Sequence, residues 1–291
     1  MKPAPFELYQ PASVSEALQL AAADEESKYL AGGQSLLAMM NFRLARPSTI
    51  IDLSRLRELD RIFDEGESLL IGSLTTHSTL EHNSLIRCGV PLLSKAALHI
   101  GHVAIRNQGT LGGTIAHADP AAELPGVLMV LDATIFTEKH ERGRREIPAA
   151  EVFDGLYSTT LEADELVTWV RVPKLELPVL AGFAETSPRH GDFADAACAV
   201  VAEVHDDVLT RLRAVLVGVA DRPIVCISRN GIDLSISQRQ IWHELWDSVV
   251  SDGVLREVDD QVLELASVVF VRACIDAVGC NSLRSKVDER R

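Results

Sequence analysis

The residues best suited to chemistry are the glycines of a short turn between an apolar stretch and a helical one. Residues 28–44 read K-Y-L-A-G-G-Q-S-L-L-A-M-M-N-F-R-L, which predicts a strand over 29–31, a tight turn at Gly32-Gly33, and a helix opening at Gln34. Glycines leave no Cβ in the way, and a helix start adds unpaired N–H donors, so this turn suits a phosphate or pyrophosphate. An ordinary strand-to-helix turn would explain the same letters equally well.

A second glycine turn stands at residues 109–115, where the chain reads G-T-L-G-G-T-I, and it runs into A-H-A-D-P-A-A-E-L-P at 116–125. Two separate turns with adjacent hydroxyl groups can hold one extended, phosphate-containing ligand between them. Neither G-x-G-x-x-G nor G-x-x-x-x-G-K-[ST] occurs, so neither the dinucleotide fingerprint nor the P-loop is present.

The other reactive residue types form no recognisable site. The five cysteines include no C-x-x-C pair, so zinc and iron–sulfur spacings are absent. The histidines show no H-E-x-x-H, and no G-x-S-x-G elbow supports hydrolysis. We therefore expect neither a metal site nor a catalytic side chain in this chain.

Composition narrows the class of protein. Hydrophobic residues make up 47% and charged residues 24% of 291 residues, as in globular proteins. The net charge of -14 argues against nucleic-acid binding, which needs a basic patch. The odd number of cysteines, the lack of a signal peptide and the lack of an apolar run of about 18 residues predict a cytoplasmic protein.

Hydrophobic periodicity predicts the elements that must position the two turns. Ser13-Val14-Ser15-Glu16 is a capping box before a helix, and the helix after Gly33 is expected to bury Leu36, Leu37, Met40 and Leu44. With a further strand over 49–53, these elements form a first lobe over 1–55.

The rest of the chain divides into two more parts. A hairpin (62–63 with 69–71), short helices and strands over 134–137, 144–147 and 166–172 predict an α+β lobe with a mixed sheet over 56–175. Residues 173–178 are the best linker. Three strands (181–185, 196–204 and 208–219) and two helices (237–250 and 259–278) then predict a C-terminal domain over 180–285.

The two turns in combination resemble the motifs A-G-G-x-S-L and T-[IL]-G-G of the FAD-binding medium subunit of molybdenum hydroxylases, which include carbon monoxide dehydrogenase and xanthine dehydrogenase. The likeness spans roughly residues 1–220 and continues in K-P-A-P-F-E-L-Y-Q-P-A-S from Lys2, R-L-A-R-P from Arg43, I-D-L from Ile51 and H-I-G-H-V-A-I-R-N-Q-G-T-L-G-G from His99. It implies an α+β fold: a two-lobed FAD-binding module of the para-cresol methylhydroxylase type, then a small domain of antiparallel sheet and helices.

The resemblance also implies which residues hold noncovalent FAD. The expected cofactor-binding residues are Leu30, Ala31, Gly32, Gly33, Gln34, Ser35, Leu36, Thr110, Leu111, Gly112, Gly113, Thr114 and Glu123. Glu123 aligns with an acidic position at the ribose or adenine end of FAD, although a carboxylate favoured by a helix N-terminus is the alternative.

Two further positions have open roles. His117 is either a structural hydrogen-bonding residue or a functional one. Phe193, in a loop of residues 189–193 that in the family lies near the isoalloxazine ring, either shields that ring or belongs to the core.

The function implied by the resemblance is electron transfer within a complex. A molybdenum–pterin large subunit would oxidise the substrate, and a small subunit with two 2Fe–2S clusters would pass electrons to the FAD of this chain, which reduces an external acceptor. The motif at 116–125 inclines the substrate toward aromatic N-heterocycles and related compounds. The alternatives are a self-sufficient flavin-dependent oxidase or reductase, and a structural subunit without flavin.

Overall fold

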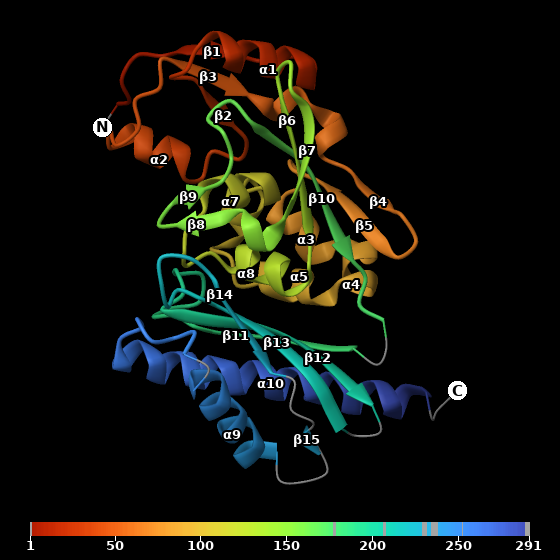
Figure 1. The fold of residues 1–291 in the computed structure, drawn as a ribbon. Helices are drawn as coiled ribbons and strands as arrows, with labels where there is room; N and C mark the ends of the chain where they lie inside the picture. The colour runs from red at the N-terminus through yellow and green to blue at the C-terminus, as the bar shows by residue number, and fades with distance from the viewer. Residues whose placement is uncertain are drawn as a thin grey trace.

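The computed structural model describes residues 2–176, 179–205, 208–228, 232–233, 238–251 and 253–288. These residues form three parts stacked along one direction, with the N-terminal lobe at the top of Figure 1 and the C-terminal sheet and long helix at the bottom. Each part is built around its own sheet. The α+β fold class predicted from the sequence is confirmed.

The first lobe is a small parallel sheet with one helix. Strands β1 (Glu7–Tyr9), β3 (Thr49–Asp52) and β2 (Lys28–Leu30) lie in the order β1-β3-β2. Helix α1 (Val14–Ala23) begins after Ser13, whose hydroxyl accepts the Glu16 amide at 3.2 Å. The Glu16 carboxylate in turn accepts the amide of Ala12 at 2.7 Å, so the predicted capping box forms with its return bond one residue earlier than expected.

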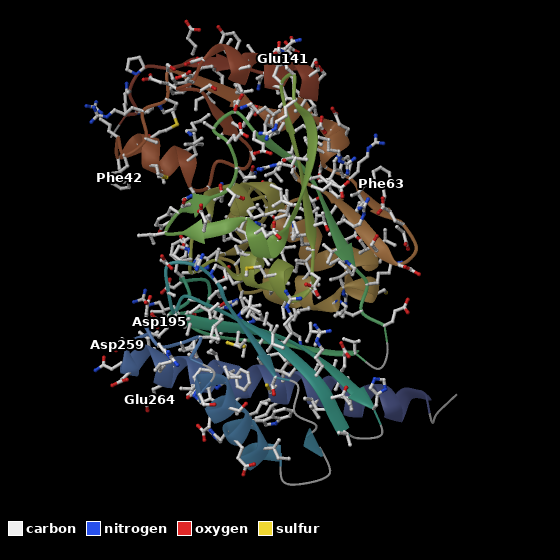
Figure 2. All side chains as sticks on the ribbon, viewed as in Figure 1. Phe42, Phe63, Glu141, Asp195, Asp259 and Glu264 are labelled. Atoms are coloured by element: carbon white, nitrogen blue, oxygen red, sulfur yellow. The ribbon has the colours of Figure 1, made fainter. Side chains whose placement is uncertain are left out.

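Helix α2 (Leu36–Asn41) is shorter and more exposed than the sequence predicted. Of the four apolar residues expected to be buried, Met40 is 2% exposed, whereas Leu37 is 43% and Leu44 is 77% exposed. The helix ends at Asn41 because Arg43 adopts a left-handed conformation with φ of 59°, so the helical period does not reach Leu44. Phe42, 67% exposed, projects from this end at the outer edge of the lobe (Figure 2).

The second lobe contains a five-stranded sheet whose strands are all antiparallel, not mixed as predicted. Two hairpins are joined by a central strand, which pairs with one strand of each hairpin in the antiparallel sense. The strands in sheet order are β4 (Ile62–Asp64), β5 (Ser68–Gly72), β10 (Leu166–Pro173), β6 (Thr134–Lys139) and β7 (Gly143–Pro148).

Short helices separate this sheet from the C-terminal part (Figure 1). They are α3 (His77–His82), α4 (Ser84–Gly89), α5 (Pro91–Ala97), α6 (Val103–Arg106), α7 (Leu111–His117) and α8 (Glu123–Val130). Single turns η1 (Leu53–Arg55), η2 (Arg57–Leu59) and η3 (Ala149–Glu151) and a small hairpin of β8 (Phe153–Gly155) and β9 (Ser158–Thr159) complete the lobe. Of the predicted linker, residues 177 and 178 lie outside the described part of the chain.

The C-terminal sheet has more strands than the three that were predicted. Strands β11 (Val179–Thr186), β12 (Ala196–His205), β13 (Val208–Val217) and β14 (Ile224–Ser228) pair in that order, and β15 (Ile232–Asp233) pairs with β13. The fourth strand follows a turn after β13, and its short apolar run gave little periodic signal in the sequence. Helices α9 (Gln238–Ser251) and α10 (Asp260–Asp288) follow.

The C-terminal sheet is covered on both faces. Helix α10 approaches β11 so closely that a Cβ on Gly182 would lie 2.0 Å from the Ala273 carbonyl oxygen. On the other face, α8 packs against β13, where a Cβ on Gly126 would lie 2.7 Å from a methyl group of Val217. Phe183, Ala197 and Val215 join the same buried cluster as the helices of the second lobe. The second lobe and the C-terminal part therefore share one core.

Candidate functional site

The structure brings the two predicted glycine turns together. A Cβ on Gly32 would lie 2.0 Å from the Gln108 carbonyl oxygen and 2.9 Å from the Gly109 Cα, and a Cβ on Gly113 would lie 3.9 Å from the Ala31 Cβ. Only glycine allows the backbones of the two lobes to approach this closely. Gly32 therefore serves the contact between the turns, and not the open approach of a ligand.

The first turn keeps free donors. Gly33 has φ of 71°, a conformation that glycine adopts without strain, and it directs the chain from β2 into α2. The Gln34 side chain folds back to the Gly32 carbonyl at 3.1 Å. Among the described residues, the backbone N–H groups of Gln34 and Ser35 donate to no protein acceptor. Two adjacent unpaired amides suit a phosphate oxygen.

The second turn differs from the prediction, because its amides are already paired. The Leu111 amide donates to the Thr75 carbonyl at 3.0 Å, and the Gly112 amide donates to the Ser73 carbonyl at 2.8 Å. The Gly113 amide donates to the Thr110 hydroxyl at 3.1 Å. A segment distant in sequence satisfies the first two donors and the turn itself satisfies the third. The polar group that this turn still offers is the partly buried Thr114 side chain.

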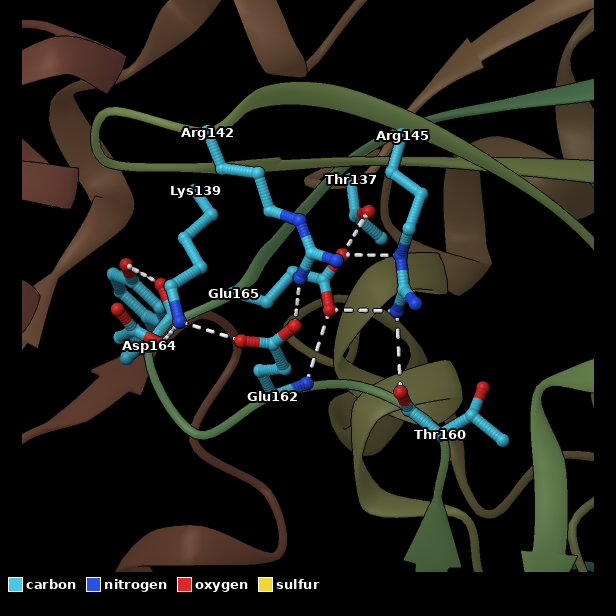
Figure 3. Close-up of polar contacts among 9 residues, drawn as sticks. Thr137, Lys139, Arg142, Arg145, Thr160, Glu162, Asp164 and Glu165 are labelled. Atoms are coloured by element: carbon cyan, nitrogen blue, oxygen red, sulfur yellow. Dashed lines mark hydrogen bonds and ion pairs between the residues drawn. The ribbon is translucent and has the colours of Figure 1, made fainter.

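A polar network ties the strand that carries the first turn to the second lobe (Figure 3). The Tyr29 hydroxyl, on β2, donates to the Asp164 carbonyl at 3.0 Å. The Asp164 carboxylate pairs with Lys139 at 2.9 Å. Nearby, Arg145 makes a bidentate pair with Glu165, at 2.8 and 2.7 Å. In this network, the Tyr29 hydrogen bond joins the first lobe to the second, and the ion pairs lie within the second lobe.

Glu123 is the first residue of α8, which packs against the C-terminal sheet. It is 7% exposed, and burial, helped by the carboxylates of Glu185 and Asp119, raises its pKa to about 8. The Glu185 side chain on β11 is 3% exposed, and burial raises its pKa to about 7. Its Oε2 lies 3.6 Å from His99 Nδ1. Glu123 is therefore largely protonated at neutral pH and Glu185 is about half protonated. A protonated acid can donate a hydrogen bond.

His117 and the 189–193 loop take up defined positions. The half-buried His117 ring lies 5.2 Å from the Tyr157 ring, whose hydroxyl donates to Asp119 at 3.3 Å; burial lowers the pKa of His117. The loop turns at Gly191, with φ of 89°, where a Cβ would lie 2.5 Å from His102 Nδ1. Phe193 is 72% exposed, so of its two alternatives the one that places it in the core is wrong.

His77 was missed as a site residue because the histidines were considered only for metal-ligand spacing. Its buried ring lies beneath the second turn, with Nε2 2.9 Å from the Thr114 hydroxyl oxygen. The sequence offered one signal, the Thr-Thr-His stretch shortly after a strand, but nothing linked that stretch to a turn 33 residues later. Within the described residues, no group of three His, Cys, Asp or Glu side chains could hold a metal ion.

Comparisons with known proteins agree with this arrangement. Residues 4–175 match the family described as "FAD binding domain in molybdopterin dehydrogenase". The chain is 40% identical over 208 residues to the nicotine 6-hydroxylase medium subunit of Paenarthrobacter nicotinovorans, covering 72% of each chain. It is 36% identical over 225 residues to the caffeine dehydrogenase subunit beta of Pseudomonas sp. strain CBB1, covering 77% of this chain and 76% of that one.

Solved structures extend the similarity to nearly the whole chain. A chain of carbon monoxide dehydrogenase from Hydrogenophaga pseudoflava superposes with a TM-score of 0.88 at 30% identity, covering 96% of this chain and 99% of that one. A chain of quinoline 2-oxidoreductase from Pseudomonas putida 86 gives a TM-score of 0.88 at 30% identity, covering 95% and 98%.

The fold and the adjoining turns define a FAD-binding subunit of an oxidoreductase. The free amides of Gln34 and Ser35 and the Thr114 hydroxyl fit the phosphates of such a cofactor. More narrowly, the chain belongs to the FAD-binding family of molybdopterin dehydrogenases. Across its described residues, none of the helices has the length and apolar character needed to cross a membrane.

Proposed function

We propose that this chain is the FAD-carrying electron-transfer subunit of a heterotrimeric molybdenum hydroxylase. It takes electrons from the 2Fe–2S clusters of a small partner and passes them to an external acceptor, while a molybdenum–pterin large subunit hydroxylates the substrate. The observation that carries the proposal is the pair of unpaired amides at Gln34 and Ser35, in a turn that touches the second glycine turn.

FAD supplies the redox chemistry, and the protein supplies binding and orientation. In the proposal, the residues from Leu30 to Leu36 surround the pyrophosphate, with the amides of the first turn as donors. The residues from Thr110 to Thr114 lie beside it, with the Thr114 hydroxyl as a further donor. Glu123 contacts the cofactor from the side of the C-terminal sheet, and the exposed Phe193 covers the isoalloxazine ring.

The proposed organisation of the chain follows the same division of labour. Lobes at 1–55 and 56–175 hold the cofactor between them, and the domain at 180–285 closes the site on the side of Phe193. The buried cluster shared by the second lobe and the C-terminal sheet supports a fixed arrangement of these two parts. Cys88, Cys198 and Cys274 are free thiols. Thiols stay reduced in the cytoplasm, which supports a cytoplasmic location.

The substrate class is proposed from the relatives. Those with the names nicotine 6-hydroxylase, caffeine dehydrogenase and quinoline 2-oxidoreductase point to an aromatic N-heterocycle or a related compound. The substrate would be bound by the large partner, so this chain determines how electrons leave the complex and not which molecule is oxidised.

The decisive experiment compares the isolated chain with the reconstituted complex. The isolated chain should bind FAD, and acid precipitation should release all of it as FAD into the supernatant. It should turn over no heterocycle by itself. With the molybdenum and iron–sulfur partners present, the substrate should bleach the flavin absorbance near ~450 nm.

Two outcomes would support the alternatives. Multiple turnovers of a substrate by the isolated chain would favour a self-sufficient flavin-dependent oxidase or reductase. A colourless chain that binds no added FAD would favour a structural subunit. Yellow colour that stays with the acid pellet would contradict noncovalent binding.

A further inference from the structure

The His77 side chain lies at the centre of the contacts that shape the second glycine turn. It is the first residue of α3 and is 4% exposed. Its backbone amide donates to the Gly109 carbonyl at 2.9 Å. Its ring Nε2 lies 3.1 Å from the Thr110 carbonyl oxygen and 2.9 Å from the Thr114 hydroxyl oxygen. One residue therefore contacts the beginning, the middle and the end of the turn.

The contacts of Nε2 determine the tautomer of His77. A carbonyl oxygen can only accept, so Nε2 must carry the hydrogen that faces Thr110. Burial lowers the pKa of His77 to about 4, so the ring is neutral at neutral pH. Nδ1 is then a lone pair, and it has no hydrogen-bond partner among the described residues. The ring is held as a neutral imidazole with its hydrogen on Nε2.

This tautomer determines the direction of the Thr114 hydroxyl. The one Nε2–H is shared between the Thr110 carbonyl and the Thr114 hydroxyl oxygen in a three-centre bond. The Thr114 oxygen therefore accepts on that side, and its own hydrogen must point elsewhere. A helical threonine often donates to the carbonyl four residues earlier. Here that carbonyl, on Thr110, already accepts from the Thr114 amide at 3.0 Å and from His77. Both of its lone pairs are occupied, so the Thr114 O–H is left to donate outward.

The rest of α3 keeps His77 in place. Glu81, one turn further along the helix, pairs with the Arg106 Nε at 2.8 Å. The Arg106 guanidinium also donates to the Gly101 carbonyl at 2.9 Å. The two side chains are only 12% and 8% exposed. The helix that carries His77 is therefore anchored on both sides of the segment that leads into the turn.

We propose that His77 is a positioning residue that turns the Thr114 hydroxyl into a dedicated donor for a phosphate oxygen of the bound cofactor. The inference rests on the proposed function, since it names FAD as the ligand. Phosphate oxygens only accept, so a hydroxyl fixed as a donor matches them. The amides of the same turn are already paired within the protein, which leaves Thr114 as the polar contact that this turn can make.

The first test measures FAD affinity in a double-mutant cycle with flavin-free protein. At the lower end of its range, a hydrogen bond to a charged group is worth about tenfold in the dissociation constant. Thr114→Val and His77→Asn should each therefore weaken FAD binding about tenfold, and their combination should weaken it little further. Thr114→Ser, which keeps the hydroxyl, and His77→Gln, whose amide N–H can reach the Nε2 position, should stay within about threefold of the wild type.

The control is His82→Asn on the same helix. The exposed His82 ring donates to the Ser78 carbonyl at 2.9 Å, and its Nε2 lies 3.5 Å from Glu81 Oε1. Within the described residues it forms no hydrogen bond or ion pair with the second turn, and Glu81 keeps its closer partner Arg106, so this variant should bind FAD normally. Melting temperatures of the flavin-free variants separate a loss of folding from a loss of positioning. A purely structural role for His77 would lower stability and would add to the effect of Thr114→Val.

The second test needs no variant and so does not depend on folding. In wild-type protein labelled with ¹⁵N-histidine, nuclear magnetic resonance should show His77 as a neutral ring protonated on Nε2. A ring protonated on Nδ1 would overturn the inference, and so would an additive cycle or unchanged FAD affinity in His77→Asn. If the wild type itself binds no FAD, the proposed function fails instead, which distinguishes the two failures.

Discussion

Replacing Glu123 with glutamine tests whether this residue is a buried neutral acid. In the folded chain the pKa of Glu123 is raised from 4.5 to about 8, first by burial and then by nearby carboxylates. Glutamine has nearly the same shape but cannot ionise. The substitution therefore removes the cost of placing a charge at this position and leaves the packing of α8 against the C-terminal sheet in place.

The sign and size of the effect follow from proton linkage. Because the folded state binds the proton more tightly than the unfolded state, stability from this group is fully present below pH 4.5 and is lost as the pH rises toward 8. Between pH 6 and pH 8 the loss is about 2 kcal/mol. Glu123→Gln does not undergo this loss, so its stability relative to the wild type should rise by the same amount over that interval.

The assay is urea unfolding of flavin-free protein at pH 6, 7 and 8. Glu185→Gln should show a smaller change in the same direction, since burial raises the pKa of Glu185 to about 7. Glu151→Gln, at an exposed position, serves as the control and should run parallel to the wild type.

One result would refute the reasoning. If Glu123→Gln and the wild type keep a constant difference from pH 6 to pH 8, within the ~0.5 kcal/mol typical of surface substitutions, Glu123 is ionised in the folded chain. The raised pKa of Glu123 would then be wrong, and with it the conclusion that this residue can donate a hydrogen bond at neutral pH.

Two further predictions concern packing around the turns. A Cβ on Gly112 would lie 2.6 Å from the Ser73 Cβ, whereas a Cβ on Gly113 would meet the Thr110 hydroxyl at 2.9 Å and otherwise only Ala31. Gly112→Ala should thus lower the free energy of unfolding by about 1–3 kcal/mol, and Gly113→Ala by less; equal losses in urea unfolding would contradict this difference. Arg106→Gln should lower the free energy of unfolding by about 3–5 kcal/mol, because Glu81 would lose its buried partner and keep only the exposed His82. A loss below about 1 kcal/mol in the same assay would show that the Arg106–Glu81 pair is not effectively buried.

Local patterns sufficed where the cause of the structure is itself local. The capping residues Ser13 and Glu16 fixed the start of α1, and the turn between Ile62 and Ile71 formed the hairpin that was predicted. Local patterns failed where a conformation was set by a single residue outside the pattern. The left-handed Arg43 ended α2 before Leu44, and no periodic argument includes such a break.

The sequence by itself determined that two glycine turns would stand after strand-like stretches, and the motifs around them were enough to indicate a flavin site. Only the tertiary structure decided what each glycine is for. Gly32 makes room for the backbone of Gln108, and Gly112 makes room for Ser73. Neither glycine makes room for a ligand. The amides of Leu111 and Gly112 donate to carbonyls of a segment far earlier in the chain. Glu123 is buried where α8 packs against the C-terminal sheet, and Glu185 of that sheet helps to raise its pKa. Hydrogen-bond satisfaction and desolvation arise from neighbours in space, so they appear only once the chain has folded.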